Sequence, residues 1–129
     1  MKPAVSTAIE EIKKQFPDST CTARDDGQGG AYIVLDAVDF GERYTPRQSW
    51  MGFHIVAQYP YADIYPVFIG GDIQRSNGQG FVAPVTPGFS FEGRPAFQVS
   101  RRSSAAAAGS GQRAVTKVLK ILSFLEELK

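Results

Sequence analysis

Residues 31–38 read AYIVLDAV, and this stretch decides the fold class that the sequence predicts. Its aromatic and β-branched side chains favour an extended strand over a helix. The residues DDGQGG at 25–30 have the composition of a tight turn, and the short β-branched run 20–24 before them predicts a partner strand. Two further strands are predicted at 49–58 and 67–69. Connections this short cannot hold crossover helices, so the sequence predicts a four-stranded antiparallel meander.

Amphipathic helices are predicted on both sides of this meander. Residues 3–16 carry apolar side chains at spacings of three and four, and Pro3 suits the first turn of a helix. Pro17 ends the helix, because the residue before a proline is pushed out of the α region. Residues 112–129 show the clearest helical pattern, with an apolar stripe formed by Val115, Val118, Leu119, Leu122 and Leu125. A stripe this wide is typical of a helix packed on a sheet.

The part of the chain between the meander and the last helix has a different texture. Residues 72–95 are rich in glycine and proline and predict a long irregular segment. A loop of this length inside a small domain is often functional. Residues 96–99 fit a short additional strand, and residues 103–111 form a low-complexity stretch that contains four alanines in a row. The predicted fold class is therefore α+β in a single domain over residues 1–129.

Composition excludes several classes of function. The chain has one cysteine and one histidine, so neither an internal disulfide nor a cysteine or histidine metal cluster is expected. No phosphate-binding glycine motif is complete, and no cofactor is expected. The net charge of +1 gives no general attraction to nucleic acid or anionic lipid. With neither a signal peptide nor a run of about 20 apolar residues, a cytoplasmic protein without a membrane anchor is expected.

Two residues have side chains suited to catalysis. Cys21 is the only thiol, but it lies between two threonines in a predicted strand, where a structural cysteine is the usual interpretation. His54 lies between Phe53 and Ile55, also in a predicted strand. It is the only histidine that a serine triad could use as its base, and a structural histidine is again the more common case. No catalytic residue is assigned from these patterns.

The most distinctive feature is a segment rich in tyrosine and proline at 59–66, which reads YPYADIYP. Rigid aromatic and proline side chains lose little entropy on binding, so they suit a preformed surface for a protein partner. The alternative interpretation is a rigid turn that fills an edge of the core. The candidate partner-binding residues in this segment are Tyr59, Pro60, Tyr61, Tyr65 and Pro66.

A second candidate surface combines arginines and phenylalanines near the irregular region. The residues are Phe89, Phe91, Arg94, Arg101 and Arg102. Planar guanidinium groups bind carboxylates or phosphates, and phenylalanine rings can stack on bases. A small nucleic-acid accessory protein is therefore an alternative, although the near-neutral net charge argues against it. Surface arginines without a ligand are the common case.

The order of elements resembles the ubiquitin-conjugating (E2) superfamily, in its divergent bacterial form. The resemblance lies in a helix, an antiparallel meander, a Tyr-Pro segment, a short strand, an irregular stretch and a terminal helix. Its sequence-specific part is Tyr59-Pro60 followed by Pro66-Val67-Phe68, with altered spacing. The resemblance implies a UBC-like fold and a role in a ubiquitin-like conjugation or antiviral defence pathway of bacteria.

The departures from the E2 pattern imply that this chain is not an active conjugating enzyme. The E2 family places its cysteine in the irregular stretch, but residues 80–93 contain none, and the family's His-Pro-Asn motif is absent. The resemblance therefore implies a non-catalytic variant that binds a ubiquitin-like modifier, an E1-like enzyme or an active E2-like protein. An atypical conjugating enzyme remains an alternative, with Cys21, Ser90, Ser100 or Ser103 as its nucleophile.

Overall fold

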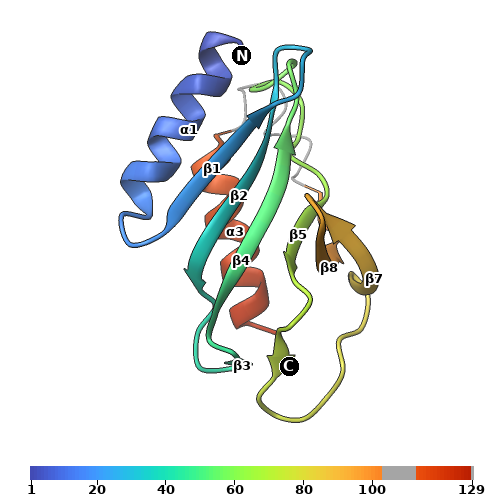
Figure 1. Ribbon diagram of the computed structural model, residues 1–129. Helices are drawn as coiled ribbons and strands as arrows, with labels where there is room; N and C mark the ends of the chain where they lie inside the picture. The colour runs from blue at the N-terminus through green and yellow to red at the C-terminus, as the bar shows by residue number, and fades with distance from the viewer. Residues whose placement is uncertain (103–112, 129) are drawn as a thin grey trace.

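The computed structural model describes residues 1–102 and 113–128 of the chain (Figure 1). Helix α1 spans Pro3–Gln15 and helix α3 spans Ala114–Glu126, so both predicted helices are confirmed with slightly shorter bounds. Pro3 occupies the first turn of α1, where its missing N–H costs nothing. The alanine-rich stretch 103–111 lies outside the described residues.

The main sheet is antiparallel throughout and has six strands, in the order β1-β2-β4-β5-β8-β7. The strands span Thr20–Asp25 (β1), Ala31–Asp39 (β2), Gln48–Ile55 (β4), Val67–Gly70 (β5), Arg94–Val99 (β8) and Val85–Phe91 (β7). Two short strands, β3 (Tyr44–Thr45) and β6 (Gln74–Arg75), pair with each other beyond one end of this sheet. The mixed α+β class and the antiparallel order of the first four strands of the sheet are confirmed.

The predicted meander was too short, and the segment predicted as irregular is partly ordered. Residues 74–75 and 85–91 form β6 and β7, which lie within the expected irregular range 72–95. Strand β7 was not predicted from the sequence because Pro87 and Gly88, which are typical of turns, interrupt its strand-like pattern of residues. They sit at a register shift between Thr86 and Phe89 on an edge strand, where a missing N–H and a positive φ are tolerated.

Both helices cover the same face of the sheet (Figure 1). Alternate residues of β2 and β4 point toward them, as the period of two in a strand requires. This helix-side core is fully buried at Ile33, Leu35, Met51, Phe53 and Ile55 from the sheet, and at Val5 and Ile12 from α1. Burial of each such side chain contributes about 1.5–3 kcal/mol by transfer from water. From α3, Val118, Ile121 and Leu125 complete the core, whereas Leu119 of the predicted stripe is 40% exposed.

The other face of the sheet carries a second, smaller core. Val34, Trp50, Phe91 and Ala96 are buried there, with Tyr32 and Phe68 packed against them. Phe91 comes from the edge strand β7, yet its ring lies over Gly52 of β4, so closely that a Cβ at position 52 would come within 2.5 Å of it. The β7–β8 hairpin therefore curls back across this face, through a two-residue turn in which Glu92 and Gly93 both have positive φ.

Candidate functional site

The loop between β4 and β5 is fixed to helix α3 at several points. Tyr59 is buried, and its hydroxyl oxygen accepts a hydrogen bond of 3.0 Å from the backbone N–H of Ala114, the first residue of α3. Ile64 is buried in the helix-side core. Asp63, next to it, contacts Lys117 of α3. Between these anchors Tyr61 is 72% exposed, so a loop with several fixed contacts presents one aromatic ring to solvent.

Lys117 holds this region together. Its side chain is 3% exposed, and its ammonium donates to both oxygens of Asp63 at 3.1 and 3.4 Å and to the backbone carbonyl of Arg101 at 2.8 Å. Burial lowers the pKa of Lys117, while the hydrogen bond and the charge of Asp63 act in the opposite direction. Lys117 thus ties the β4–β5 loop and the segment after β8 to the same turn of α3.

Two exposed arginines lie over aromatic rings beside this anchor. The Arg102 guanidinium lies 3.9 Å from the centre of the Tyr65 ring, and the Arg101 guanidinium lies 4.5 Å from the centre of the Phe124 ring. Such cation–π contacts hold the guanidinium plane while leaving its N–H edges available. Neither arginine has a carboxylate within ion-pair distance in the described part of the chain.

A groove of about 620 Å³ runs along α3 next to these arginines. Its lining is apolar at Leu119 and Phe124, basic at Lys120, Arg101 and Arg102, and acidic at Glu127. We name the combined area the loop–helix surface and define it by Tyr61, Tyr65, Arg101, Arg102, Leu119, Lys120 and Phe124. It combines an apolar floor with positive charge, which suits a ligand that carries acidic groups beside an apolar patch.

The structure separates the sequence-predicted candidates into three groups. Tyr65, Arg101 and Arg102 come together on the loop–helix surface, and Tyr61 is exposed on the same β4–β5 loop as Tyr65. Tyr59 and Phe91 are buried, so they support the fold and have little surface to offer a partner; Pro60 and Pro66 are half-buried beside the anchors. Phe89 is exposed on β7, and Arg94 forms an ion pair of 2.7 Å with Asp36 on the opposite face of the sheet.

Sequence reasoning missed Lys117 and the groove. One signal was present: Lys117 lies three residues after Ala114 and four before Ile121, which places it on the buried side of the helix. A lysine at such a position needs a buried partner. Asp63 supplies it, but nothing in the sequence pairs the two residues.

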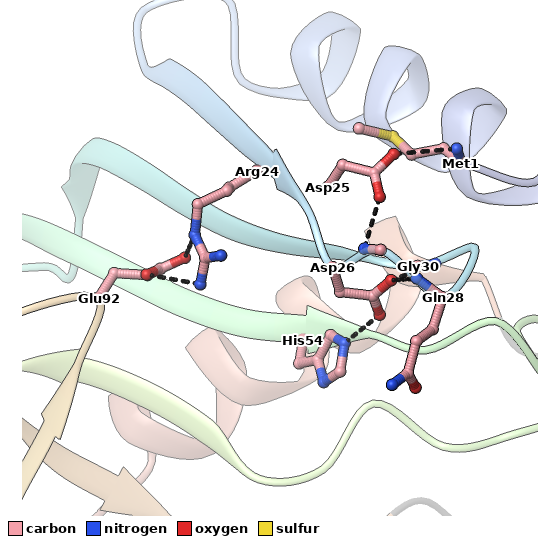
Figure 2. A network of polar contacts seen from close by, with 9 residues as sticks. Met1, Arg24, Asp25, Asp26, Gln28, Gly30, His54 and Glu92 are labelled. Carbon is pink, nitrogen blue, oxygen red and sulfur yellow. Dashed lines mark hydrogen bonds and ion pairs between the residues drawn. The ribbon is translucent and has the colours of Figure 1, made fainter.

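A second polar network joins the β1–β2 turn to strand β4 (Figure 2). The Asp26 carboxylate accepts hydrogen bonds from the backbone N–H groups of Gln28 and Gly30 and contacts Nε2 of His54 at 2.7 Å. The hydrogen bond with His54 and the one from Gln28 lower the pKa of Asp26. Only glycine fits at position 30, because a Cβ there would come within 2.3 Å of the Ile55 carbonyl oxygen.

Among the residues that the structure describes, no hydroxyl or thiol is hydrogen-bonded to His54 of the Asp26–His54 pair. Among the described residues, the only hydrogen bond of the His54 ring is the one to Asp26, and the ring stacks on Tyr32 at 4.2 Å. Catalysis by a histidine base needs a hydroxyl or thiol within hydrogen-bond reach. The network therefore fixes the turn to the sheet and orients the histidine. The described residues contain no group of three or more His, Cys, Asp or Glu side chains that could hold a metal ion.

The other candidate nucleophiles are also poorly placed for transfer chemistry. Cys21 on β1 is half-buried, and burial raises the pKa of its thiol, with Lys13 opposing that effect. The Ser100 hydroxyl accepts a hydrogen bond from the Gln98 amide, and Ser90 lies exposed on β7. Ser103 lies outside the described residues.

Comparison with known proteins returned no relative. No family model matches the chain, and no curated protein or solved structure is similar to it at a significant level. Neither described helix is long and apolar enough to cross a membrane.

Proposed function

We propose that this protein is a non-catalytic interaction module of the ubiquitin-conjugating (E2) type that binds a protein partner in the bacterial cytoplasm. The observation that carries the proposal is the exposed Tyr61 ring on a loop whose neighbouring residues are fixed to α3 through Tyr59 and through Asp63. A loop that is already ordered loses little entropy when it binds. An exposed tyrosine in such a position is typical of residues that dominate the binding energy of an interface.

The two stacked arginines indicate the chemistry of the partner. Arg101 and Arg102 present positive charge beside the apolar side chains of Leu119 and Phe124. A matching partner surface carries Asp or Glu side chains around an apolar patch, because paired guanidinium and carboxylate groups give both specificity and a faster association rate. The resemblance to the E2 superfamily adds the partner's identity: a ubiquitin-like modifier, its E1-like activating enzyme or an active E2-like protein.

The state of Cys21 supports the non-catalytic part of the proposal. A conjugating enzyme transfers its cargo through a thiolate, and burial raises the pKa of the Cys21 thiol, which keeps it protonated at neutral pH. Incubation of the purified protein with an E1-like enzyme, ATP and a ubiquitin-like modifier is therefore expected to give no covalent adduct on a non-reducing gel. An adduct would replace this proposal with an atypical conjugating enzyme.

Site-specific photo-crosslinking tests the surface directly. Tyr61→p-benzoylphenylalanine is compared with the same replacement of Val82, which is 68% exposed and lies outside the loop–helix surface. The expected result is a crosslink from position 61 to a ubiquitin-like, E1-like or E2-like protein in the native host. It should disappear when Arg101→Ala and Arg102→Ala are added. No crosslink from position 61, or the same products from both positions, would contradict the proposal.

A further inference from the structure

A separate pocket lies at the end of the sheet where strands β3 and β6 pair. It has a volume of about 420 Å³ and shares no residue with the loop–helix surface. Its lining residues are Ile73, Gln74, Arg75, Gly78, Gln79, Gly80, Phe81, Pro87 and Phe97. We name it the Arg75 pocket. The inference that follows does not depend on the proposed function.

Arg75 is the unusual residue of this pocket. It is 8% exposed, and its one side-chain hydrogen bond to the described part of the chain is a long contact of 3.4 Å from a guanidinium nitrogen to the Gly80 carbonyl oxygen. No carboxylate lies within ion-pair distance of Arg75 in the described ranges. A charged side chain removed from most of the solvent without an ionic partner is costly, and proteins rarely keep one without a use for it.

The guanidinium nitrogens of Arg75 that make no hydrogen bond keep some contact with solvent. No buried side-chain nitrogen or oxygen lacks a hydrogen-bond partner among the described residues. The nitrogens of Arg75 that make no bond with the described residues are therefore reached by solvent, and Arg75 is one of the residues that line the pocket. Guanidinium N–H groups in this position form a donor site for an anion that enters the pocket.

The remaining walls are mostly apolar and are held in place by stacking. The Phe81 ring lies 4.9 Å from the Phe97 ring and 5.9 Å from the Tyr44 ring, centre to centre. Tyr44 is itself fixed by a hydrogen bond from its hydroxyl to the carbonyl oxygen of Leu125. The pocket thus combines a preformed aromatic wall with one positive charge, the usual design of a site for a small ligand with a single anchoring group.

We propose that the Arg75 pocket binds a carboxylate attached to an apolar group. One guanidinium balances one negative charge and matches the planar, two-oxygen geometry of a carboxylate. The apolar group lies against Phe81 and Phe97, and Gln74 and Gln79 also line the pocket. A small carboxylic acid and the free C-terminus of a peptide both have this chemistry.

Phenylacetate and phenylacetamide form the matched probe pair for the whole protein. Both have the same ring and nearly the same shape, but only the acid carries the charge. Chemical-shift changes of the Phe81 and Gly80 amides on titration are expected with the acid, and the amide is expected to bind at least about tenfold more weakly, as for the loss of a charged hydrogen bond. Equal binding of both probes, or no binding of either, would overturn the proposal.

Arg75→Met separates a ligand-binding role from a structural one. Methionine has a similar length and no charge, so the variant is expected to lose phenylacetate binding by about tenfold or more. It is also expected to melt at or above the temperature of the unaltered protein, because an unpaired buried charge has been removed. A fall in melting temperature of more than about 4 °C would show that Arg75 stabilises the fold, and would overturn the proposal.

Three further probes identify the source of the carboxylate. N-acetylglycyl-phenylalanine with a free C-terminus is compared with its C-terminal amide, and both with phenylacetate. Tighter binding of the free peptide assigns the pocket to a chain end, and tighter binding of phenylacetate assigns it to a small acid. Inorganic phosphate is expected to bind more weakly than either acid, because a dianion leaves one charge unbalanced. Phosphate binding as tight as that of phenylacetate would contradict the carboxylate assignment.

Discussion

Arg24 and Glu92 lie at opposite edges of the sheet, yet their side chains are joined by two hydrogen bonds of 2.9 and 3.1 Å (Figure 2). Arg24 belongs to β1, and Glu92 lies in the turn of the β7–β8 hairpin. The contact forms only because the sheet curls and the hairpin folds over its outer face. Arg94 of the same hairpin forms a second ion pair, with Asp36 on β2. Two ion pairs therefore join the β7–β8 hairpin to β1 and β2 over the smaller aromatic core.

We expect the buried ring of Phe91 to stabilise the folding of the β7–β8 hairpin over the sheet more than the Arg24–Glu92 ion pair does. Phe91→Ala removes the ring that packs on Gly52, Trp50 and Phe68, and a cost of about 3 kcal/mol in the free energy of unfolding is expected. Urea denaturation followed by tryptophan fluorescence measures it, because Trp50 lies in the same core.

Phe89→Ala is the matched control, since Phe89 lies on the same strand but is 40% exposed. It should cost less than a third of the Phe91→Ala effect. Glu92→Gln keeps the turn and removes the charge, and it should have a small effect that vanishes at high salt because the pair is partly solvated. A larger loss from Glu92→Gln than from Phe91→Ala would show that charge, rather than packing, closes the hairpin.

The hydroxyl of Tyr59 takes the place of a helix cap. Helix α3 has no side-chain cap from Arg113, and the buried N–H of Ala114 donates to the Tyr59 hydroxyl instead. Tyr59→Phe leaves that N–H without its partner, and a loss of roughly 1–2 kcal/mol is expected. Hydrogen exchange should show faster exchange of the Ala114 amide, with the rest of α3 less affected.

Tyr61→Phe is the control for this substitution, because the Tyr61 ring is exposed and its hydroxyl makes no hydrogen bond with the described residues. It should leave both stability and the exchange of Ala114 unchanged. Equal effects of Tyr59→Phe and Tyr61→Phe would argue against the capping role.

Local patterns predicted the parts of the fold that depend on periodicity. The apolar spacing of 3–16 and the stripe of Val115, Val118, Leu119, Leu122 and Leu125 predicted both helices, and the run of aromatic and β-branched side chains in 31–38 predicted the central strand. Strand β7 was missed because Pro87 and Gly88 are turn residues that an edge bulge happens to accommodate. A two-residue turn at Glu92-Gly93 between two apolar runs was the signal that could have identified the hairpin.

The candidate sites depend on contacts between residues far apart in the chain, which local patterns do not contain. Tyr61 was predicted as a surface residue, but its loop is ordered by Asp63 and Lys117, which are 54 positions apart. Arg75 looks like any surface arginine in the sequence. Its burial follows from the pairing of β3 with β6 and from the placement of Phe81 and Phe97 around it. Such burial becomes visible only when the whole chain has folded.

The thiol of Cys21 provides a test of its protonation state. Burial raises its pKa, the positive charge of Lys13 lowers it and the negative charge of Glu10 raises it. At pH 7.5, alkylation by iodoacetamide is expected to be several-fold slower than that of N-acetylcysteine, because only the thiolate reacts. Glu10→Gln should accelerate the reaction and Lys13→Gln should slow it. The same rate as N-acetylcysteine, or opposite effects of the two variants, would contradict this assignment.

The Asp26 carboxylate makes stability depend on pH in a defined direction. Its hydrogen bond with His54 and the one from the Gln28 N–H lower its pKa below the ordinary value of 3.8. The unfolded chain therefore binds a proton more readily than the folded one. The stabilisation is fully present above pH 3.8 and is lost as the pH falls through the lower pKa of the folded state.

Asp26→Asn should consequently destabilise the protein at neutral pH and matter progressively less in acid. The difference in free energy of unfolding between the two proteins, measured by urea denaturation, is expected to stay large from about pH 7 to 5 and to narrow below the ordinary carboxyl pKa. Asp18→Asn, at an exposed aspartate with no ion pair among the described residues, should change stability little throughout. A difference for Asp26→Asn that widened in acid would reverse the sign of the linkage and show that the Asp26–His54 contact does not favour the ionised carboxylate.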